Sequence, residues 1–504
     1  MNSQRIGRRL AAGAAVALTL GGTALAAAST DRGPSTTTDP YVVPVADGVK
    51  IASLLTVSDA GSASNGYEMV GIPDGIGLTD GPGRDFTVFM NHELPGASGV
   101  PRRHGETGAF VSELEVDSRT LEVEAGQDLV DPGVRYWDYT TRQYSAAPSP
   151  GQPAQFNRWC SSYLTLPGQL DNERTGRGYD GQIYFGNEEA GDEGRAFGVT
   201  TDGQAQQLPR FGLFSWENTV VGLNRGDVTY AQGQEDLATG QLHVYVGRKL
   251  RQGNEFRRAG LTNGHQFVVD LQDEAVDSDA EFRATYGKNT PARFDLGEDE
   301  EVAWDQPGAA QNAEAAAKGL TLNRIEDGAF DPRHPEDFYF VTTEGGVGAT
   351  TGPSGRDGGG VWRLSYDDVE RPWEGGTLTL LLDGSEAPFL NKPDNVAFDR
   401  KGHFMIQEDP GNNVQLARIV AFDVDTGRRA VLARFDPARF APGGADFITQ
   451  DEESSGIVDA SRFLGRRAFV FDAQVHKANP EPDKVEYGQL LTMRVRSWRA
   501  VFDE

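Results

Sequence analysis

The chain has 504 residues, of which 75 are acidic and 47 are basic, and its formal net charge is -28. This charge argues against nucleic acid as a partner, because a surface that binds DNA or RNA has to neutralise phosphates. The single cysteine excludes an intramolecular disulfide, and the 62 glycines favour an all-β protein with many tight turns. Solubility alone explains the bulk acidity, so only clustered carboxylates would indicate a cation site.

The first residues are typical of an export signal. Arginines precede an apolar run over residues 10–20, and small residues at 24–26 form a cleavage pattern. The run is too short to span a bilayer, so we expect residues 1–28 to be a signal peptide and the protein to be secreted or otherwise extracytoplasmic. Arg8 and Arg9 leave both twin-arginine and general export open.

Residues 29–48 follow as a polar leader, and its first part, residues 29–40, is expected to be disordered. We expect residues 49–504 to form a single catalytic domain. No later apolar stretch is long enough for a membrane helix, so the sequence predicts no membrane contact.

Short β-rich runs that end in polar or acidic residues recur through this domain, with turn signals between them. An all-β chain with six such units is best explained as a six-bladed β-propeller with inserted loops. Each blade is then a small sheet, and one strand end per blade faces the central channel. The runs are DFTVFMNHE, GQIYFGNEE, QLHVYVGRK, DFYFVTTEGG, GHFMIQEDPG and AFVFDAQVH.

Acidic residues stand directly after most of these runs. Because equivalent strand ends of a propeller converge near one axis, the carboxylates would repel one another unless cations lay between them. The alternative is that the acids lie by chance on a solvent-exposed rim of the propeller. Their recurrence in most of the units favours a metal site. Histidines are few and scattered, which argues against zinc, whereas carboxylate oxygens suit calcium. The acids are Glu93, Glu188, Glu189, Glu344, Glu408 and Asp409.

Cys160 lies in the stretch RWCSS and has no partner for a disulfide. A thiolate among carboxylates could hold iron or another transition metal. A lone cysteine is also commonly a small buried hydrophobe, and the neighbouring residues do not decide between the two readings.

Residues 273–320 are acidic and alanine-rich, and they interrupt the run of strands. We expect them to form an inserted loop or lid, with a short helical insertion over residues 309–318.

Arg324 and Glu326, in NRIEDG, are two residues apart on a segment that reads as extended, so they point to the same side. An arginine fork suits an oxyanion such as phosphate, and a glutamate beside it could hold a cation. An ordinary ion pair within a strand is the alternative. The sequence contains no G-x-S-x-G elbow, P-loop or dinucleotide fingerprint.

Several segments read together resemble the PhoX-type alkaline phosphatases and their uncharacterised relatives, in an order and spacing that match across residues 65–495. The R-x-E-D-G and D-E-E-S-S-G-I motifs are the most specific. The PDN and EDPG block is weaker, since calcium-dependent propeller lactonases have something similar. The segments are FNRWCSS, GYDGQIYFGNEEAGDEGRAFG, NRIEDGAFDP, KPDNVAFDRKGHFMIQEDPGNN and FITQDEESSGIVDA.

The resemblance implies a six-bladed propeller, twin-arginine export, and hydrolysis of phosphomonoesters with a metal-bound oxygen as nucleophile. It implies a cofactor of calcium and iron ions at the channel mouth. Arg324 would hold phosphate and Glu326 would bind metal, both as catalytic residues. The implied metal ligands are Cys160, Glu93, Glu188, Glu189, Glu235, Glu326, Asp394, Glu408, Glu452 and Glu453.

The chain departs from the family by having Arg-Trp before Cys160, where members tend to carry Asn-Asn. Two alternatives stay open: a calcium-dependent propeller lactonase or esterase that uses the PDN and EDPG block, and a non-catalytic propeller stabilised by calcium. The expected partner is a small-molecule phosphate ester, and we expect a monomer.

Overall fold

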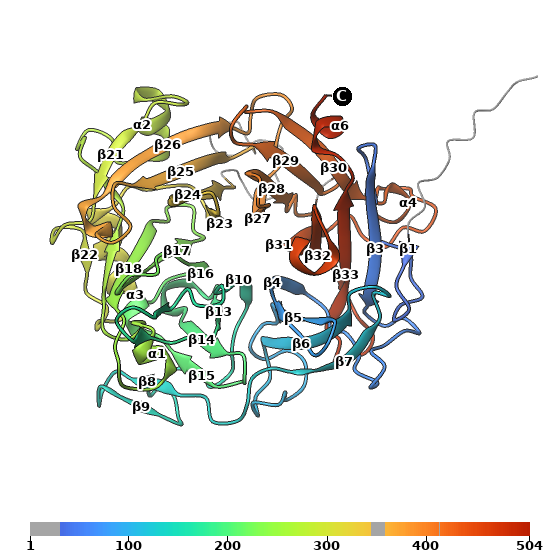
Figure 1. Ribbon diagram of the computed structural model, residues 1–504, viewed down its shortest axis with the longest axis horizontal. Coiled ribbons are helices and arrows are strands. Elements are labelled where there is room, and N and C mark those ends of the chain that lie inside the picture. Colours follow the sequence, from blue (N-terminus) through green and yellow to red (C-terminus); the bar gives the residue numbers. More distant parts are fainter. Residues whose placement is uncertain (1–30, 344–357, 413, 504) are drawn as a thin grey trace, which may run out of the picture.

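A computed structural model of the chain describes residues 31–343, 358–412 and 414–503. Six small antiparallel sheets stand in a ring around a central channel (Figure 1). The protein is therefore a six-bladed β-propeller, which confirms the predicted fold. The predicted signal peptide lies outside the described residues.

Each blade is built on four neighbouring antiparallel strands. Blade 1 has β4 (Pro73–Asp80), β5 (Asp85–His92), β6 (Phe110–Asp117) and β7 (Val123–Asp128). Blade 2 has β10 (Trp159–Leu164), β13 (Ile183–Glu188), β14 (Ala196–Thr200) and β15 (Ala205–Gln207). Blade 3 has β16 (Trp216–Val221), β17 (Val228–Glu235), β18 (Leu242–Arg248) and β19 (His265–Val268).

Blade 4 has β23 (Ile325–Asp331), β24 (His334–Thr342), β25 (Gly360–Tyr366) and β26 (Gly376–Asp383). Blade 5 has β27 (Pro393–Phe398), β28 (His403–Glu408), β29 (Arg418–Asp423) and β30 (Arg429–Phe435). Blade 6 has β31 (Glu452–Asp459), β32 (Ala468–Ala478), β33 (Glu486–Val495) and, from the other end of the chain, β3 (Val49–Thr56). Two small hairpins lie outside the blades: β8 (Tyr136–Asp138) with β9 (Gln143–Ser145), and β11 (Asp171–Asn172) with β12 (Arg177–Gly178).

The first strand of each blade lines the channel. β4, β10, β16, β23, β27 and β31 contact one another in this order, and β31 contacts β4 again, which closes the ring (Figure 1). β3 pairs antiparallel with β33, so the start of the domain is joined to its end within blade 6. The six runs recognised in the sequence fall one in each blade. Five are second strands, but QLHVYVGRK is β18, the third strand of blade 3.

Hydrophobic clusters fill the spaces between neighbouring blades. Ile76 and Val88 of blade 1, for example, pack in one cluster with Val470 and Leu490 of blade 6. Each blade is thus covered on both faces, and the inner strands are mostly buried. Charged residues within the first strands are therefore exceptions that need a physical reason.

The polar leader is ordered from its first described residue, contrary to the expected disorder. β1 (Asp31–Arg32) pairs with β3, and β2 (Val42–Pro44) pairs with β30 at the edge of blade 5. Thr36 is buried and its hydroxyl contacts the side chains of Thr56 and Asp59. The segment is ordered because strand pairing and these side-chain partners satisfy the polar groups that its composition exposes.

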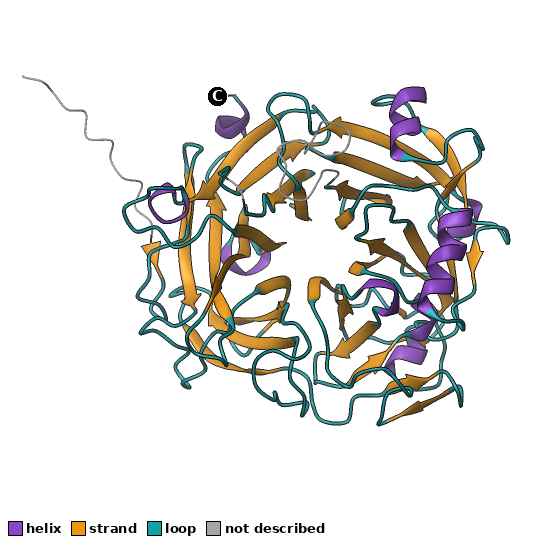
Figure 2. Ribbon diagram, turned by 180° about the vertical axis from the view of Figure 1, so that it is seen from behind, coloured by secondary structure: helices purple, strands orange, loops and turns teal. Residues whose placement is uncertain are grey.

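The insertion at residues 273–320 contains the predicted helix, α3 (Gly308–Lys318), and a shorter one, α2 (Asp279–Thr285). It does not form a lid. β21 (Ala292–Asp295) and β22 (Glu301–Val302) add edge strands to blades 4 and 3, and β20 (Asp270–Leu271) pairs with β21. Both helices lie at the periphery of the ring (Figures 1 and 2).

The remaining helices are α1 (Glu255–Arg258), α4 (Pro437–Phe440), α5 (Ser461–Leu464) and α6 (Trp498–Phe502). Within the described residues, every helix is too short or too polar to cross a membrane.

Candidate metal centre

The same backbone irregularity recurs near the start of five first strands. In blade 1, Pro73 pairs with His92 and Ile76 pairs with Met90, so the regular pairing skips the residues between. The first strands of blades 2, 3, 4 and 5 break register in the same place. A bulge of this kind leaves residues out of the ladder and re-aims their side chains. The second residue of each first strand forms what we call the inner ring: Asp74, Cys160, Glu217, Glu326, Asp394 and Glu453.

A second ring comes from the end of the second strand of each blade. Here one residue donates its backbone N–H to the carbonyl oxygen of the residue just before the first strand, at distances from 2.8 to 3.0 Å. The repeated bond fixes each of these residues at the same end of its blade. We call this set the outer ring: Glu93, Glu189, Asp236, Thr343, Asp409 and His476.

Three acids of the inner ring meet across blades 3, 4 and 5. Carboxylate oxygens of Glu217, Glu326 and Asp394 lie within 4.8 Å of one another, and all three residues are buried. Burial, followed by the charges of neighbouring acids, raises the pKa of Glu217 and of Asp394 well above its ordinary value. Glu326 Oε1 is buried and accepts no hydrogen bond from the described residues, although Arg324 Nη2 lies 2.9 Å away. An all-oxygen cluster with an unsatisfied carboxylate oxygen fits a hard divalent cation.

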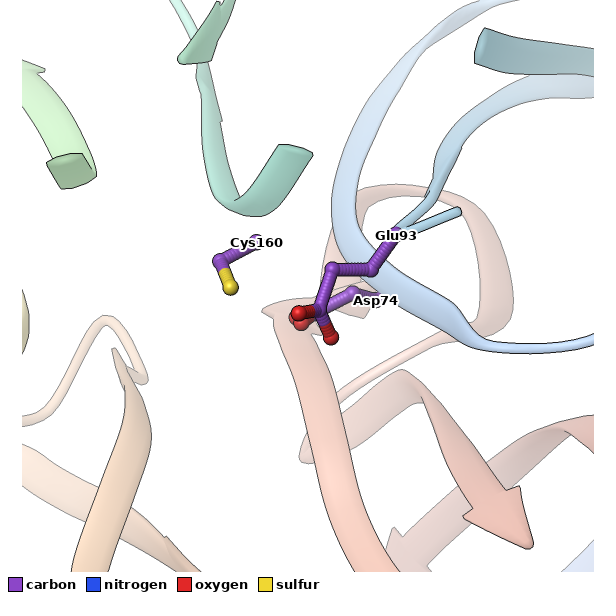
Figure 3. Close-up of side chains that lie close together, drawn as sticks. All are labelled: Asp74, Glu93 and Cys160. Carbon is purple, nitrogen blue, oxygen red and sulfur yellow. The ribbon is translucent and has the colours of Figure 1, made fainter. Parts of the chain in front are cut away.

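A second cluster joins blades 1 and 2. Ligand atoms of Asp74, Glu93 and Cys160 lie within 4.8 Å of one another, and Figure 3 shows the sulfur and the carboxylates turned toward one another. The Cys160 thiol donates to Glu189 Oε2 at 3.1 Å. Burial, and then the neighbouring carboxylates, raise the pKa of this thiol well above its usual value. One soft sulfur among hard oxygens fits a transition metal, whose charge would favour the thiolate.

Each cluster has an arginine beside it. Arg324 holds Asp236 with two bonds, of 2.9 Å from Nε and 2.8 Å from Nη2. Arg158 donates from Nε to Glu93 Oε1 at 2.8 Å and from Nη2 to Glu189. The Arg158 guanidinium lowers the pKa of Glu189, but burial outweighs it and raises this pKa to about 8.

A layer of polar side chains crosses the channel directly below the inner ring. Asn395 of blade 5 donates to Ser161 Oγ of blade 2 at 2.7 Å, although these two blades face each other across the axis. Asn218 donates to Asp327 Oδ1 at 2.7 Å in the same layer. Below this layer lies a separate cavity of about 550 Å³ with mostly apolar walls. The hydrogen-bonded layer therefore separates the acidic rings from the rest of the channel.

The structure brings together six of the ligands implied by the resemblance. Cys160, Glu326, Asp394 and Glu453 belong to the inner ring, and Glu93 and Glu189 to the outer ring. Glu344, which the sequence also singled out, lies outside the described residues.

Four other implied ligands turn into their blades. Arg195 binds Glu188 with bonds of 2.6 Å from Nε and Nη2, and Arg418 binds Glu408 with bonds of 2.7 and 2.6 Å. Glu235 accepts from the backbone of Gln241, and Glu452 accepts from the backbone of Ala417. Each of the four is directly followed by an inner- or outer-ring residue, and neighbouring strand residues point to opposite faces.

Sequence reasoning missed five residues of the rings: Asp74, Glu217, Asp236, Thr343 and His476. A signal for the first two was present, because their strands begin PDG and WEN, much as the other first strands begin PDN, WCS and IED. Asp236 was missed because the third strand of blade 3 was taken for its second strand.

The comparisons agree with this geometry. Residues 179–442, more than half of the chain, match the family described as alkaline phosphatase PhoX. The chain belongs to this family. As a PhoX family member it is a phosphatase of the alkaline phosphatase type. No curated protein matches the chain by sequence.

One solved structure supports the same fold. The PhoX of Pseudomonas fluorescens, solved with vanadate as a transition state analogue, is 12% identical with a TM-score of 0.62, and the match covers 92% of this chain and 98% of that one. A protein of unknown function from Dyadobacter fermentans is 9% identical over 89% of this chain and 100% of its own, with a TM-score of 0.41. At 12% identity the likeness to the Pseudomonas structure concerns the propeller fold.

Proposed function

We propose that this PhoX family protein hydrolyses phosphomonoesters at the two rings, with metal ions held by the two clusters. The observation that carries the proposal is the meeting of acids from all six blades, most of them buried, beside Arg324, whose guanidinium suits an oxyanion. Buried carboxylates this close together are costly unless cations lie between them.

The donors suggest which ions would bind. Glu217, Glu326 and Asp394 offer only oxygen and suit calcium, whereas the cluster with Cys160 suits iron or another transition metal. Bound ions would supply Lewis-acid stabilisation of phosphoryl oxygens and lower the pKa of a coordinated water.

The protein's own contribution to the reaction is orientation. Asp236 and Glu326 hold the Arg324 guanidinium from two sides, so the fork needs little ordering when an anion arrives. Its Nη1 makes no hydrogen bond within the described residues and is available for a phosphoryl oxygen. A donor fixed in this way stabilises charge that develops on the oxyanion in the transition state.

Residues 1–28 would export this enzyme, by the twin-arginine or the general route, to where phosphate esters are met outside the cytoplasm.

The test is hydrolysis of a chromogenic phosphomonoester by the purified chain, with and without calcium, next to a lactone substrate. Monoester hydrolysis that calcium restores after chelation is the expected result. Lactone hydrolysis without phosphatase activity would favour the lactonase alternative, and no activity on either substrate would favour a propeller with structural calcium.

Arg324 gives a sharper test within the same assay. We expect Arg324→Ala to lower kcat/KM by about 100-fold or more, as is usual for the loss of one fixed oxyanion donor. Arg324→Lys should recover only part of this, because lysine lacks the planar fork. Wild-type kinetics in the alanine variant would show that Arg324 serves only its ion pairs.

A further inference from the structure

The residue just before each first strand occupies an equivalent place in all six blades. Its carbonyl accepts the repeated hydrogen bond from the outer ring. In four blades its backbone is left-handed: Ile72 has φ 50°, Arg158 47°, Arg324 53° and Lys392 49°. A residue other than glycine in this conformation costs ~1 kcal/mol or more, so a side chain is retained there at a cost in stability.

Three of these four residues are basic, in blades 2, 4 and 5. Lys392 is only 6% exposed, whereas the side chains of Arg158 and Arg324 are 45% and 28% exposed. The two arginines are therefore the members of this set that a ligand can reach.

Arg158 repeats the contacts of Arg324 two blades away. The backbone N–H of Arg158 donates to Leu94 and that of Arg324 donates to Leu237, each the residue after the outer-ring acid of the preceding blade. Through Nε, each arginine then binds that same acid, Glu93 at 2.8 Å and Asp236 at 2.9 Å.

The two arginines also agree in the second acid that each guanidinium contacts. Nη2 of each arginine reaches a second acid, Glu189 for Arg158 and Glu326 for Arg324. For both arginines Nη1 makes no hydrogen bond within the described residues. Each metal cluster therefore carries one arginine, held by two carboxylates and with one donor edge free.

We propose that Arg158 is a second oxyanion-binding residue of the active site, which contacts the phosphoryl group from the Cys160 cluster while Arg324 contacts it from the Glu326 cluster. This inference rests on the proposed phosphatase function. Two cationic forks, one beside blade 2 and one beside blade 4, suit a phosphoryl group with two negative charges and several free oxygens. Arg158 would thus select phosphomonoesters, which are dianions, over phosphodiesters, which are monoanions.

The competing explanation is that Arg158 only neutralises Glu93 and Glu189. That role would change the metal content and stability of a variant, but it would not change monoester binding relative to diester binding. The readouts that separate the two roles are therefore the inhibition constant of inorganic phosphate and the ratio of kcat/KM for a monoester to that for a diester.

The experiment begins with wild-type protein, p-nitrophenyl phosphate, bis-p-nitrophenyl phosphate and inorganic phosphate. A wild-type protein that neither hydrolyses the monoester nor binds phosphate would overturn the proposed function itself. If it does both, Arg158→Ala is expected to weaken phosphate inhibition at least tenfold and to lower kcat/KM about 100-fold for the monoester but clearly less for the diester. Arg158→Lys should fold and recover the charge but only part of the discrimination.

Arg177→Ala is the matched control. Arg177 is 46% exposed and pairs with Asp227, much as Arg158 is 45% exposed and pairs with its own acids, but it lies in the small β11–β12 hairpin and not in the rings. The control should keep wild-type kinetics. Metal content of each variant is measured by elemental analysis. Equal losses on monoester and diester, or wild-type phosphate inhibition in Arg158→Ala and Arg158→Lys, would overturn the inference.

Discussion

Cys160 is the residue whose role the sequence left most open. It is 6% exposed, which a packing role would also give, but its sulfur faces Asp74 and Glu93 and donates to Glu189. A small buried hydrophobe would be expected to face apolar side chains. The polar surroundings therefore favour a ligand over packing.

Cys160→Ser tests this reading, because serine keeps the shape but is a far poorer ligand for a soft metal. Wild-type protein with ferric iron on this thiolate should absorb visible light, and the serine variant should lose the band, most of its iron and most of its activity. Its unfolding midpoint with calcium present should stay close to wild type. A colourless wild-type protein, with equal activity in the serine variant, would leave Cys160 as a packing residue.

At the scale of the strand, two consecutive acids have different surroundings. Glu188 points into blade 2, where Arg195 binds it and both side chains are almost fully buried, at 3% and 1% exposure. Glu189, one residue later, points to the channel mouth and meets Arg158 and Cys160. The alternation of side chains along a strand separates the two acids, and we expect Glu188 to serve stability and Glu189 to serve the metal site.

Replacing each of the two acids by glutamine separates these roles. Glu188→Gln should lower the free energy of unfolding by ~3 kcal/mol or more, since it leaves Arg195 as an unpaired buried charge. Glu189→Gln should leave stability near wild type and lower metal content and activity instead. Urea unfolding measures the stability of both variants, and elemental analysis measures their metal content. An equal loss of stability in the two variants would contradict the separate roles.

The same alternation of side chains explains which parts of the fold and of the site could be predicted from the sequence. The six recurring runs predicted six blades, and this fold prediction was right, although in blade 3 the run that was recognised is the third strand and not the second, which ends in QED. The runs could not say which acid of a pair faces the channel, because that depends on register, and register is set by bulges between strands far apart in the chain. Asp74 and Glu217 have no acidic residue directly beside them in the sequence, so no acidic run marks them.

At the scale of the molecule, the six blades hold more buried negative charge at one end of the channel than the arginines neutralise. Asp74, Glu217, Asp394 and Asp472 all have pKa values raised well above normal, first by burial and then by other carboxylates. Asp472 is 0% exposed, and neither of its carboxylate oxygens has a hydrogen-bond partner in the part of the chain that the structure describes. The propeller tolerates this charge because strands of six separate sheets fix the acids in place and β3 holds the ring closed.

This arrangement predicts how stability depends on metal and pH together. In the metal-free protein the folded-state pKa of these acids exceeds the unfolded value, so their contribution to stability is fully present below the unfolded pKa and is lost as pH rises through the folded pKa. For Glu189 that window runs from 4.5 to about 8. Bound cations compensate the ionised carboxylates and bind only the folded state, so they should stabilise more as pH rises.

We therefore expect chelator to lower Tm only slightly at mildly acidic pH and strongly at mildly alkaline pH, with calcium restoring both Tm and activity. Thermal unfolding of metal-loaded and stripped protein at several pH values measures the difference directly. The control is Glu217→Gln with Asp394→Asn, which removes two carboxylates that repel each other across blades 3 and 5. That variant should lose much of the calcium response and, when stripped, be more stable than stripped wild type at alkaline pH. If Tm differed by the same amount at every pH, the buried carboxylates would not be the groups that the cations neutralise.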